Sequence, residues 1–311
     1  MELNKLKRID RVRTLHIEKI LFFILLLTNV GLTSQAGAAS LERVMEKGVL
    51  EVAVYKNFPP YSYTEKGKQL GIDIDLAKEL ASRMSLKASI RMVGADENMD
   101  DDLRNNIWKG HYLGGGTADV MFHVPHDRKY AAMVDQVNFI SPYQLERLVF
   151  AFNKAKLGDA PTIANFTHDP IGVELDTLSD FYLLRAVNGK VAEKIKHYKS
   201  ITEAVAALNK GEVVAVMGPK GEIEGALATS AITTKTTNNI VVSRLVTPGL
   251  SQTHWALGLA VKASYPKLAG EIDTQMVSMV KDGAIKTIFE KYGVTYAAPS
   301  IAPEKQKVTQ N

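Results

Sequence analysis

Residues 49–61 read VLEVAVYKNFPPY, an apolar run that stops at an aromatic, proline-containing loop. The stretch from Val49 to Val54, apolar except for Glu51, predicts a buried β-strand. Because Pro59 and Pro60 have no N–H to donate to a strand ladder, the strand must end before them. Residues 73–84 then carry apolar side chains at helical spacing with charges between them, which predicts an amphipathic helix. A strand followed by such a helix begins a β-α-β unit.

The rest of the chain repeats this alternation of strand and helix. Further strands are predicted at 88–92, 118–124, 171–174, 213–217 and 255–261, and further helices at 101–109, 178–187, 201–209, 265–281 and 283–292. The pattern predicts an α/β fold made of two units, each a mixed, mostly parallel sheet flanked by helices.

Two stretches that join the units, 149–153 and 245–252, have the composition of extended chain rather than of helix. We therefore predict a first lobe from residues 40–148 and 251–298, and a second lobe from residues 149–250 with a hinge strand at both of its ends. Two crossovers of this kind allow one lobe to close on the other. Residues 299–311 are expected to form a flexible tail.

The N-terminus has the order of a secretory signal peptide over residues 1–39. Six Lys and Arg residues precede an apolar run from Ile20 to Leu32, and small residues follow it. A membrane-spanning helix needs about 20 apolar residues, so this shorter run predicts a cleaved signal rather than an anchor. We expect cleavage after Ala38 or Ala39, a periplasmic mature protein and no membrane anchor after cleavage.

The charge of the expected mature chain is nearly balanced. The whole chain carries +4, but residues 1–39 contain six Lys or Arg and three Asp or Glu, which leaves +1 for the remainder. Nucleic acid is therefore not an expected partner. The chain has no cysteine, so an exported protein of this sequence depends on its apolar core rather than on disulfides.

Several loops are expected at the crevice between the lobes, because the carboxyl ends of parallel strands face the ligand in open α/β sheets. Tyr55, Phe58 and Tyr61 follow the first strand and either line the cleft or plug their own lobe. The guanidinium of Arg128 could form a bidentate pair of hydrogen bonds with a ligand carboxylate. The alternative is an ordinary surface arginine.

Lobe 2 supplies further candidates at the same crevice. Asp176 and Thr177 precede a helix, and either side chain could cap its free N–H groups, with Asp176 favoured, or those groups would receive an anionic ligand group. Pro219 ends a strand and Lys220 follows it, where the lysine could reach an acidic ligand or partner.

His111, His123 and His126 do not have the spacing of a metal site, and no cysteine assists them, so no metal and no other cofactor is predicted. His123 is expected in the cleft or packed against backbone. Trp108, His111 and Tyr112 form either a partner surface on an inserted loop or core packing. The loops show no Ser/His/Asp set and no paired carboxylates, which predicts a binding protein rather than an enzyme.

In order, these segments resemble the family 3 solute-binding proteins, the periplasmic receptors of polar amino acid importers. The motifs that carry the resemblance are Leu50-Glu-Val-Ala-Val54, Pro59-Pro-Tyr61, Gly71-Ile-Asp-Ile-Asp-Leu-Ala77, Ala118-Asp-Val120, Phe139-Ile-Ser-Pro-Tyr143, Asp282-Gly283 and Lys291-Tyr-Gly293. The resemblance implies the two-lobed periplasmic-binding-protein-like II fold and an ABC permease as partner. It also implies that an acidic residue holds the ligand ammonium at a position where this chain has Pro219.

Three further segments look like the binding proteins encoded beside quinoprotein dehydrogenases, the MoxJ/XoxJ type. They are Trp108-Lys-Gly-His-Tyr112, Asp119-Val-Met-Phe-His-Val-Pro125 and Val216-Met-Gly-Pro219. The narrower resemblance implies an accessory protein of a PQQ-dependent methanol or alcohol dehydrogenase. The alternative is a substrate-binding protein of an ABC transporter for a polar amino acid or another small polar solute.

Overall fold

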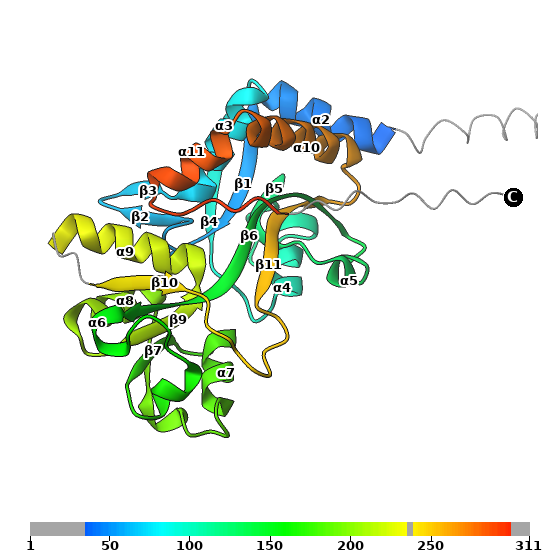
Figure 1. The fold of residues 1–311 in the computed structure, drawn as a ribbon. Helices are drawn as coiled ribbons and strands as arrows, with labels where there is room; N and C mark the ends of the chain where they lie inside the picture. The colour runs from blue at the N-terminus through cyan, green and yellow to red at the C-terminus, as the bar shows by residue number, and fades with distance from the viewer. Residues whose placement is uncertain (1–34, 235–238, 300–311) are drawn as a thin grey trace, which may run out of the picture.

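The computed structural model describes residues 35–234 and 239–299, which form two lobes joined by a long strand (Figure 1). In lobe 1, β1 (Val49–Tyr55) lies between β4 (Lys87–Val93) and β5 (Val120–Pro125), parallel to both. The helix α3 (Ile72–Arg83) makes the connection from β1 to β4 and buries its apolar face in the lobe. The predicted β-α-β start of the fold is confirmed.

The start of α3 depends on a glycine. Gly71 has a φ of 132°, and a Cβ at this position would lie 2.1 Å from the carbonyl oxygen of Tyr61. Only glycine fits this close approach of two backbone segments. The helix is thereby held against the loop that follows β1.

The helix predicted at 101–109 differs in the structure. It begins earlier, as α4 (Met99–Leu103), and continues as a π-helical turn, η1 (Arg104–Trp108). The side chain of Asn98 caps α4 by accepting a hydrogen bond from the N–H of Asp101. After β5 comes a short helix, α5 (Arg128–Ala131), capped by Asp127.

A single strand, β6 (Val137–Asn153), runs through both lobes. Its first part pairs with β11 (His254–Lys262) in lobe 1, and its second part pairs with β9 (Ala215–Pro219) and β10 (Ile240–Ser243) in lobe 2. A nine-stranded sheet results, with the order β4-β1-β5-β11-β6-β9-β7-β8 and β10 beside β6. The predicted hinge segment 149–153 is thus the end of a strand that begins twelve residues earlier.

Lobe 2 repeats the arrangement of lobe 1. Its strand β7 (Ile171–Glu174) lies between β8 (Ile195–Tyr198) and β9, parallel to both. The flanking helices are α7 (Leu178–Arg185), α8 (Ile201–Lys210) and α9 (Lys220–Thr234), with the short elements α6 (Lys154–Leu157), η2 (Ile163–Thr167) and η3 (Ala192–Lys194). The predicted helices near 178 and 201 are confirmed, whereas α9 was not predicted.

The chain returns to lobe 1 through residues 244–253. This segment contains no strand and makes a turn at Pro248 and Gly249, so the expectation of a second hinge strand is wrong. After β11, the helices α10 (Pro266–Lys281) and α11 (Ala284–Lys291) pack on lobe 1 with α2 (Gln35–Lys47) and α3. The hairpin of β2 (Tyr63–Glu65) and β3 (Lys68–Leu70) projects from the same lobe.

Each lobe has apolar clusters that cover the two faces of its part of the sheet. In lobe 1 one cluster gathers residues of α3, α10 and α11, and another gathers residues of η1 and β5. In lobe 2 the two clusters are built around α7 and α8. The predicted two-lobed α/β fold is confirmed.

The expected signal peptide falls mostly on residues outside the described part, and its expected cleavage point lies within α2. Among the residues that the structure describes, no helix has both the length and the apolar character needed to span a membrane.

Candidate functional site

Aromatic rings from the end of β1, the loop after it and β5 meet near the carboxyl ends of β1 and β5. The ring of Phe58 stacks on Tyr61, with centroids 5.4 Å apart, and meets the edge of Tyr55 at 6.3 Å. The imidazole of His123 lies against both Phe58 and Tyr61, at 4.8 and 4.3 Å. The fold therefore brings together the four aromatic side chains that were expected at the crevice.

His123 is held in place by a buried carboxylate. Its Nδ1 lies 3.2 Å from Oδ2 of Asp73, which is fully buried in the first turn of α3. The hydroxyl of Tyr143 donates to the other oxygen of Asp73 at 2.8 Å. The sequence analysis did not foresee this His/Asp pair, which joins a strand to a helix; among the described residues, no hydroxyl side chain hydrogen-bonds His123.

Tyr61 connects lobe 1 with the crossing strand and with lobe 2. Its side chain is almost wholly buried, and its hydroxyl donates to Oε2 of Glu146 on β6 at 2.7 Å. The backbone N–H of Gly221, in the first turn of α9, donates to the same carboxylate at 3.2 Å. Burial raises the pKa of Glu146, while these hydrogen bonds act in the opposite direction. Tyr61 thus takes part in the contact between the two lobes in this structure.

Two glycines allow α9 to lie directly on the loop after β1. A Cβ at Gly221 would come within 2.1 Å of the Tyr61 hydroxyl oxygen, and a Cβ at Gly225 within 2.6 Å of the Pro60 ring. The two positions are four residues apart and share one face of the helix. The lobes therefore touch through backbone and ring atoms, without a gap between α9 and Pro60.

Lys220 takes part in a second contact between the lobes. Its Nζ lies 3.1 Å from Oε1 of Glu224 and 3.2 Å from the carbonyl oxygen of Thr295, which lies after α11. The backbone N–H of Thr295 donates to Glu224 at 2.7 Å. In this arrangement Lys220 joins α9 to the C-terminal segment of lobe 1, and its charge is already paired.

Three carboxylates lie near one another where lobe 2 faces the crossing strand. Glu222, in the first turn of α9, has a pKa well above its ordinary value because it is buried and because Glu174 and Glu146 are close. Burial also raises the pKa of Glu174, which follows β7 and accepts a hydrogen bond from the N–H of Ile201. Among the described residues, nothing donates a hydrogen bond or an ion pair to Glu222. The site is electronegative and retains one unpartnered carboxylate.

Of the two capping candidates at the start of α7, Thr177 caps the helix, and the preference for Asp176 is wrong. Asp176 does not cap the helix, because Thr177 occupies the capping position and its Oγ1 accepts from the N–H of Asp180 at 3.3 Å. Asp176 is exposed with a φ of 60°, and its own N–H donates to Asp180. The helix terminus is thus satisfied by protein groups. Pro219 ends β9 as predicted, beside Val149 and Leu148 of β6.

The remaining candidates lie on lobe 1. Arg128 is exposed at the start of α5 and makes no ion pair among the described residues. Trp108 packs against the apolar cluster of η1 and β5, which supports the core alternative for this residue. The Nδ1 of His111 accepts a backbone hydrogen bond from Leu113, and Tyr112 next to it is 86% exposed.

No metal was expected, and within residues 35–234 and 239–299 no group of three or more His, Asp or Glu side chains is placed to hold an ion. The donor sets that do exist pair with tyrosines, lysines or backbone N–H groups. The residues present therefore give no reason to assign a metal or a cofactor.

The sequence analysis missed Glu146, Glu222 and Asp73. Asp73 was seen only as a charge on an amphipathic helix, although it is fully buried. Glu146 stands beside Arg147 in a strand that also carries the polar residues Asn138, Ser141 and Gln144. No local pattern in the sequence therefore indicates that Glu146 is buried. Glu222 lies three residues beyond Pro219, in a helix whose apolar residues show no clear helical spacing in the sequence.

Comparisons with known proteins agree with this fold. The model of the family described as bacterial extracellular solute-binding proteins, family 3, matches residues 50–107. The chain is similar to the L-cystine-binding protein TcyJ of Escherichia coli (strain K12), with 22% identity over 275 residues, 86% of this chain and 91% of the relative. It is also similar to the cyclohexadienyl dehydratase of Pseudomonas aeruginosa, with 38% identity over 73 residues, 23% of this chain and 26% of the relative.

Among solved structures, the chain is similar to an ancestral cationic amino acid solute binding protein, AncCDT-1, with a TM-score of 0.63 and 22% identity, over 82% of this chain and 99% of the other. It is similar as well to a polar amino acid ABC uptake transporter substrate binding protein from Streptococcus thermophilus, with a TM-score of 0.60 and 17% identity, over 83% and 90% of the two chains. None of these relatives is described as a dehydrogenase partner, so that narrower resemblance stays a prediction. The chain thus has the two-lobed fold of these binding proteins, and residues 50–107 match the family 3 solute-binding model.

Proposed function

We propose that the chain is a periplasmic receptor that delivers a small solute to an ABC permease, and that this solute carries an ammonium or guanidinium group. The observation that carries the proposal is the unpartnered carboxylate of Glu222, which lies close to Glu146 and Glu174. Glu222 is half-buried, and a negative charge that is partly withdrawn from water beside two other acids is costly unless a cation pairs with it. A cationic solute supplies that partner.

The rest of the proposed site follows from the placement of the other side chains. Phe58, Tyr55 and His123 form an aromatic wall on lobe 1, and a cation or a planar group packs well against such rings. The exposed guanidinium of Arg128 is our candidate for binding a solute carboxylate. Pro219 stands where the family resemblance implies an acid for the ligand ammonium, and Glu222, in the first turn of α9, supplies an acid three residues further along.

The relatives' names are consistent with this class of solute. Cystine carries two ammonium groups, and AncCDT-1 is described as a binding protein for cationic amino acids. We infer binding rather than catalysis, because His123 and the buried acids contact tyrosines and backbone groups and no nucleophile stands beside them.

A thermal-shift screen of the purified protein tests the proposal. L-Arginine, L-lysine and L-cystine are the cationic probes, with L-glutamate and glucose as comparisons. A ligand at a hundred times its dissociation constant adds about 2.7 kcal/mol to the unfolding free energy, or roughly 5–10 °C in melting temperature. Glu222→Gln should abolish the shift, whereas Glu193→Gln, an exposed acid of the same lobe, should leave it intact. Stabilisation by L-glutamate alone would refute the proposal.

A second candidate is the accessory role beside a quinoprotein dehydrogenase. The observation that favours it is the exposed apolar tip of the loop after η1, where Tyr112 is 86% and Leu113 is 78% exposed. Exposed aromatic and aliphatic side chains on a loop are typical of partner surfaces. This role would be favoured if the dehydrogenase co-purifies with the wild type but not with a variant that carries Tyr112→Ser and Leu113→Ser. It would be excluded if the dehydrogenase co-purifies with neither the wild type nor the variant.

A further inference from the structure

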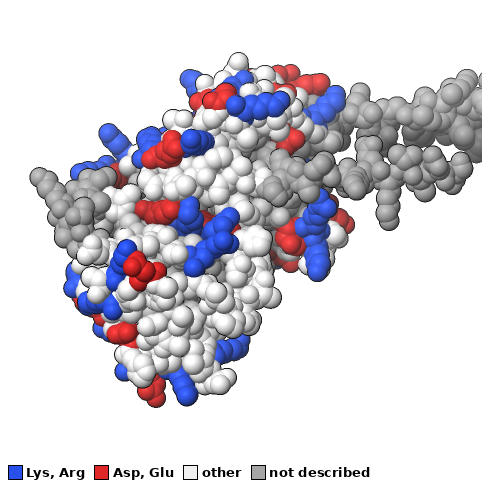
Figure 2. Space-filling view, viewed as in Figure 1, with Lys and Arg blue, Asp and Glu red and all other residues white. Residues whose placement is uncertain are grey.

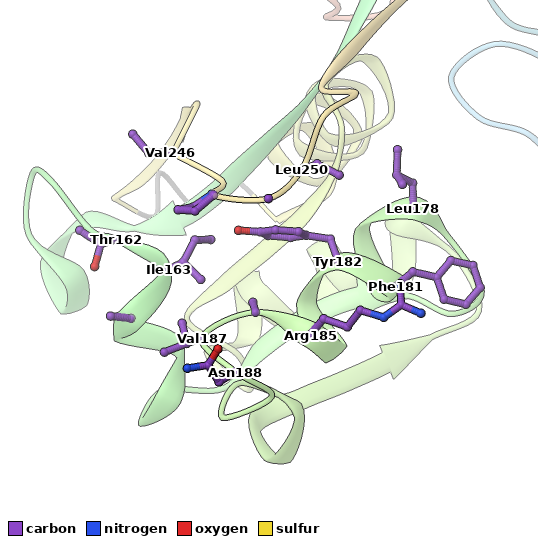
Figure 3. A pocket seen from close by; sticks show the side chains of 14 residues that line it. Thr162, Ile163, Leu178, Phe181, Tyr182, Arg185, Val187, Asn188, Val246 and Leu250 are labelled. Atoms are coloured by element: carbon purple, nitrogen blue, oxygen red, sulfur yellow. The ribbon is translucent and has the colours of Figure 1, made fainter.

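Lobe 2 contains a cavity of about 750 Å³ (Figure 3). It lies between η2, α7 with the turn that follows it, and the return segment around Pro248. The residues that line it are Thr162, Ile163, Ala164, Leu178, Phe181, Tyr182, Arg185, Ala186, Val187, Asn188, Val246, Pro248, Gly249 and Leu250. None of them belongs to the contacts of Tyr61, Glu146 and Glu222, so the cavity is separate from the site proposed above.

The lining is predominantly apolar, and much of it is open to solvent. Val246 is 83% exposed, Phe181 49% and Leu178 42%. Leu175 and Leu184, which adjoin α7, are exposed as well. Figure 2 shows that this face of lobe 2 is largely free of charged side chains. Exposed apolar surface gathered around one concavity is characteristic of a binding site rather than of an ordinary monomer surface.

A few polar groups reach into this apolar lining without a protein partner. The Tyr182 hydroxyl, whose pKa is raised by burial, points toward the Ile163 end of the cavity in Figure 3. The Arg185 guanidinium extends toward Phe181 at the other end. Among the described residues, neither side chain has a hydrogen bond or an ion pair with protein, nor does the amide of Asn188. No acidic residue lines the cavity, so its only formal charge is positive.

The turn that closes one side of the cavity has an unusual backbone. Val187 and Asn188 have φ angles of 52° and 56°. A β-branched residue in the left-handed region is disfavoured, and such positions occur preferentially where a loop is shaped for a ligand. The turn presents Val187 and Asn188 to the same cavity.

We propose that this cavity is a second ligand site, which binds a small molecule with a flat apolar body and one anionic group. The volume is within the range of small-molecule pockets, roughly 300–1,000 Å³. The apolar body lies along Tyr182 between Ile163 and Leu250, and the anion pairs with Arg185. This cavity binds an anion, whereas the site near Glu222 binds a cation, so the two sites select different solutes.

The probe for this site is 1-anilinonaphthalene-8-sulfonate, a flat aromatic sulfonate whose fluorescence rises in apolar surroundings. A titration of the purified protein should saturate at one site. N-phenyl-1-naphthylamine, which has the same rings without the sulfonate, should bind at least severalfold more weakly. Arg185→Gln should weaken sulfonate binding roughly three- to tenfold, while Lys190→Gln, a nearby exposed lysine that does not line the cavity, should have no effect.

Two further variants locate the probe without disturbing the core. At the exposed Val246, Val246→Asp should weaken binding and Val246→Lys should strengthen it, each roughly two- to fivefold. Ala164→Trp should block the cavity, because Ala164 is exposed and lines it. If the neutral amine binds as tightly and the Val246 pair has no effect, the site is an apolar peptide groove and the proposal is wrong. Unchanged binding in Ala164→Trp would show that the probe lies elsewhere and would equally overturn it.

Discussion

At the scale of single residues, one hydroxyl group makes a buried hydrogen bond in the contact between the lobes. Tyr61 and Glu146 are 85 positions apart, and both are buried. When a buried carboxylate loses a hydrogen bond, its desolvation is no longer compensated, and the folded state is destabilised by about 1–3 kcal/mol. The Tyr61 hydroxyl therefore stabilises the packing of the loop after β1 against lobe 2.

Tyr61→Phe should lower the unfolding free energy by about 1–3 kcal/mol, because it leaves Glu146 with backbone donors only. Urea unfolding of the ligand-free protein measures this. Tyr63→Phe is the matched control, since the hydroxyl of the half-buried Tyr63 has no hydrogen bond among the described residues. Equal effects of the two variants would show that the Tyr61 hydrogen bond contributes nothing.

Glu222 should make stability depend on pH. Its pKa in the folded chain is raised above that of an unfolded glutamate, about 4.3. The contribution of Glu222 to the unfolding free energy is therefore fully present below about pH 4. It is lost as the pH rises through the pKa of Glu222 in the folded protein. Relative to Glu222→Gln, which cannot titrate, the wild type should become less stable between pH 4 and pH 8, by about 1.4 kcal/mol for each unit of pKa shift. A difference between the two proteins that stays constant over this range in urea unfolding would contradict the assignment.

At the scale of elements, the approach of α9 to lobe 1 requires glycine. In an exposed helix interior, Gly→Ala stabilises by about 0.5–1 kcal/mol. At Gly225 the added Cβ would lie 2.6 Å from Pro60 instead. Gly225→Ala should therefore destabilise the contact and separate the lobes, which would be visible as a larger radius of gyration in small-angle X-ray scattering.

Gly270 on α10 provides the control for this change, because a Cβ there meets nothing within 4 Å. Gly270→Ala should stabilise the protein and leave the radius of gyration unchanged. If Gly225→Ala also stabilises and leaves the dimensions unchanged, the close packing of α9 on Pro60 is not a feature of the protein in solution.

The elements show which parts of the fold the sequence can predict. β1, α3 and α8 were predicted because their apolar spacing and their end signals are local, such as the Ser200 cap and Gly211 at the ends of α8. The helix α9 was not, because its apolar residues form no clear stripe and it contains two glycines whose purpose lies in the other lobe. The length of β6 also escaped prediction, since Pro142 interrupts its pattern.

At the scale of the whole molecule, the order of strands and helices was sufficient to predict two lobes and a crossing. The candidate site was only partly predictable. Tyr55 and Phe58 lie at or after the end of β1, and His123 lies near the end of β5, so topology alone could place them at the crevice. Glu146 and Glu222 depend on how the crossing strand and α9 meet, and a contact between distant segments leaves no local pattern.

The two proposed sites also differ in the salt dependence expected of them. Glu146 is buried and Glu174 and Glu222 are half-buried, so their attraction for a cation should be screened less by added salt than that of an exposed charge. Arg185 is exposed, so its attraction for an anionic probe should be screened strongly. Dissociation constants at low and high sodium chloride test this difference; a stronger salt effect at the Glu222 site would contradict it.

The pairing of a cationic solute with Glu222 is tested most directly by counting protons on binding. Calorimetric titration at pH 6, repeated in two buffers of different ionisation enthalpy, measures the protons released. A cation beside Glu222 lowers its raised pKa, so binding of L-arginine or of the cationic probe that stabilises the protein most should release a fraction of a proton, and Glu222→Gln should release none. Binding without proton release, or proton release that persists in Glu222→Gln, would contradict this account.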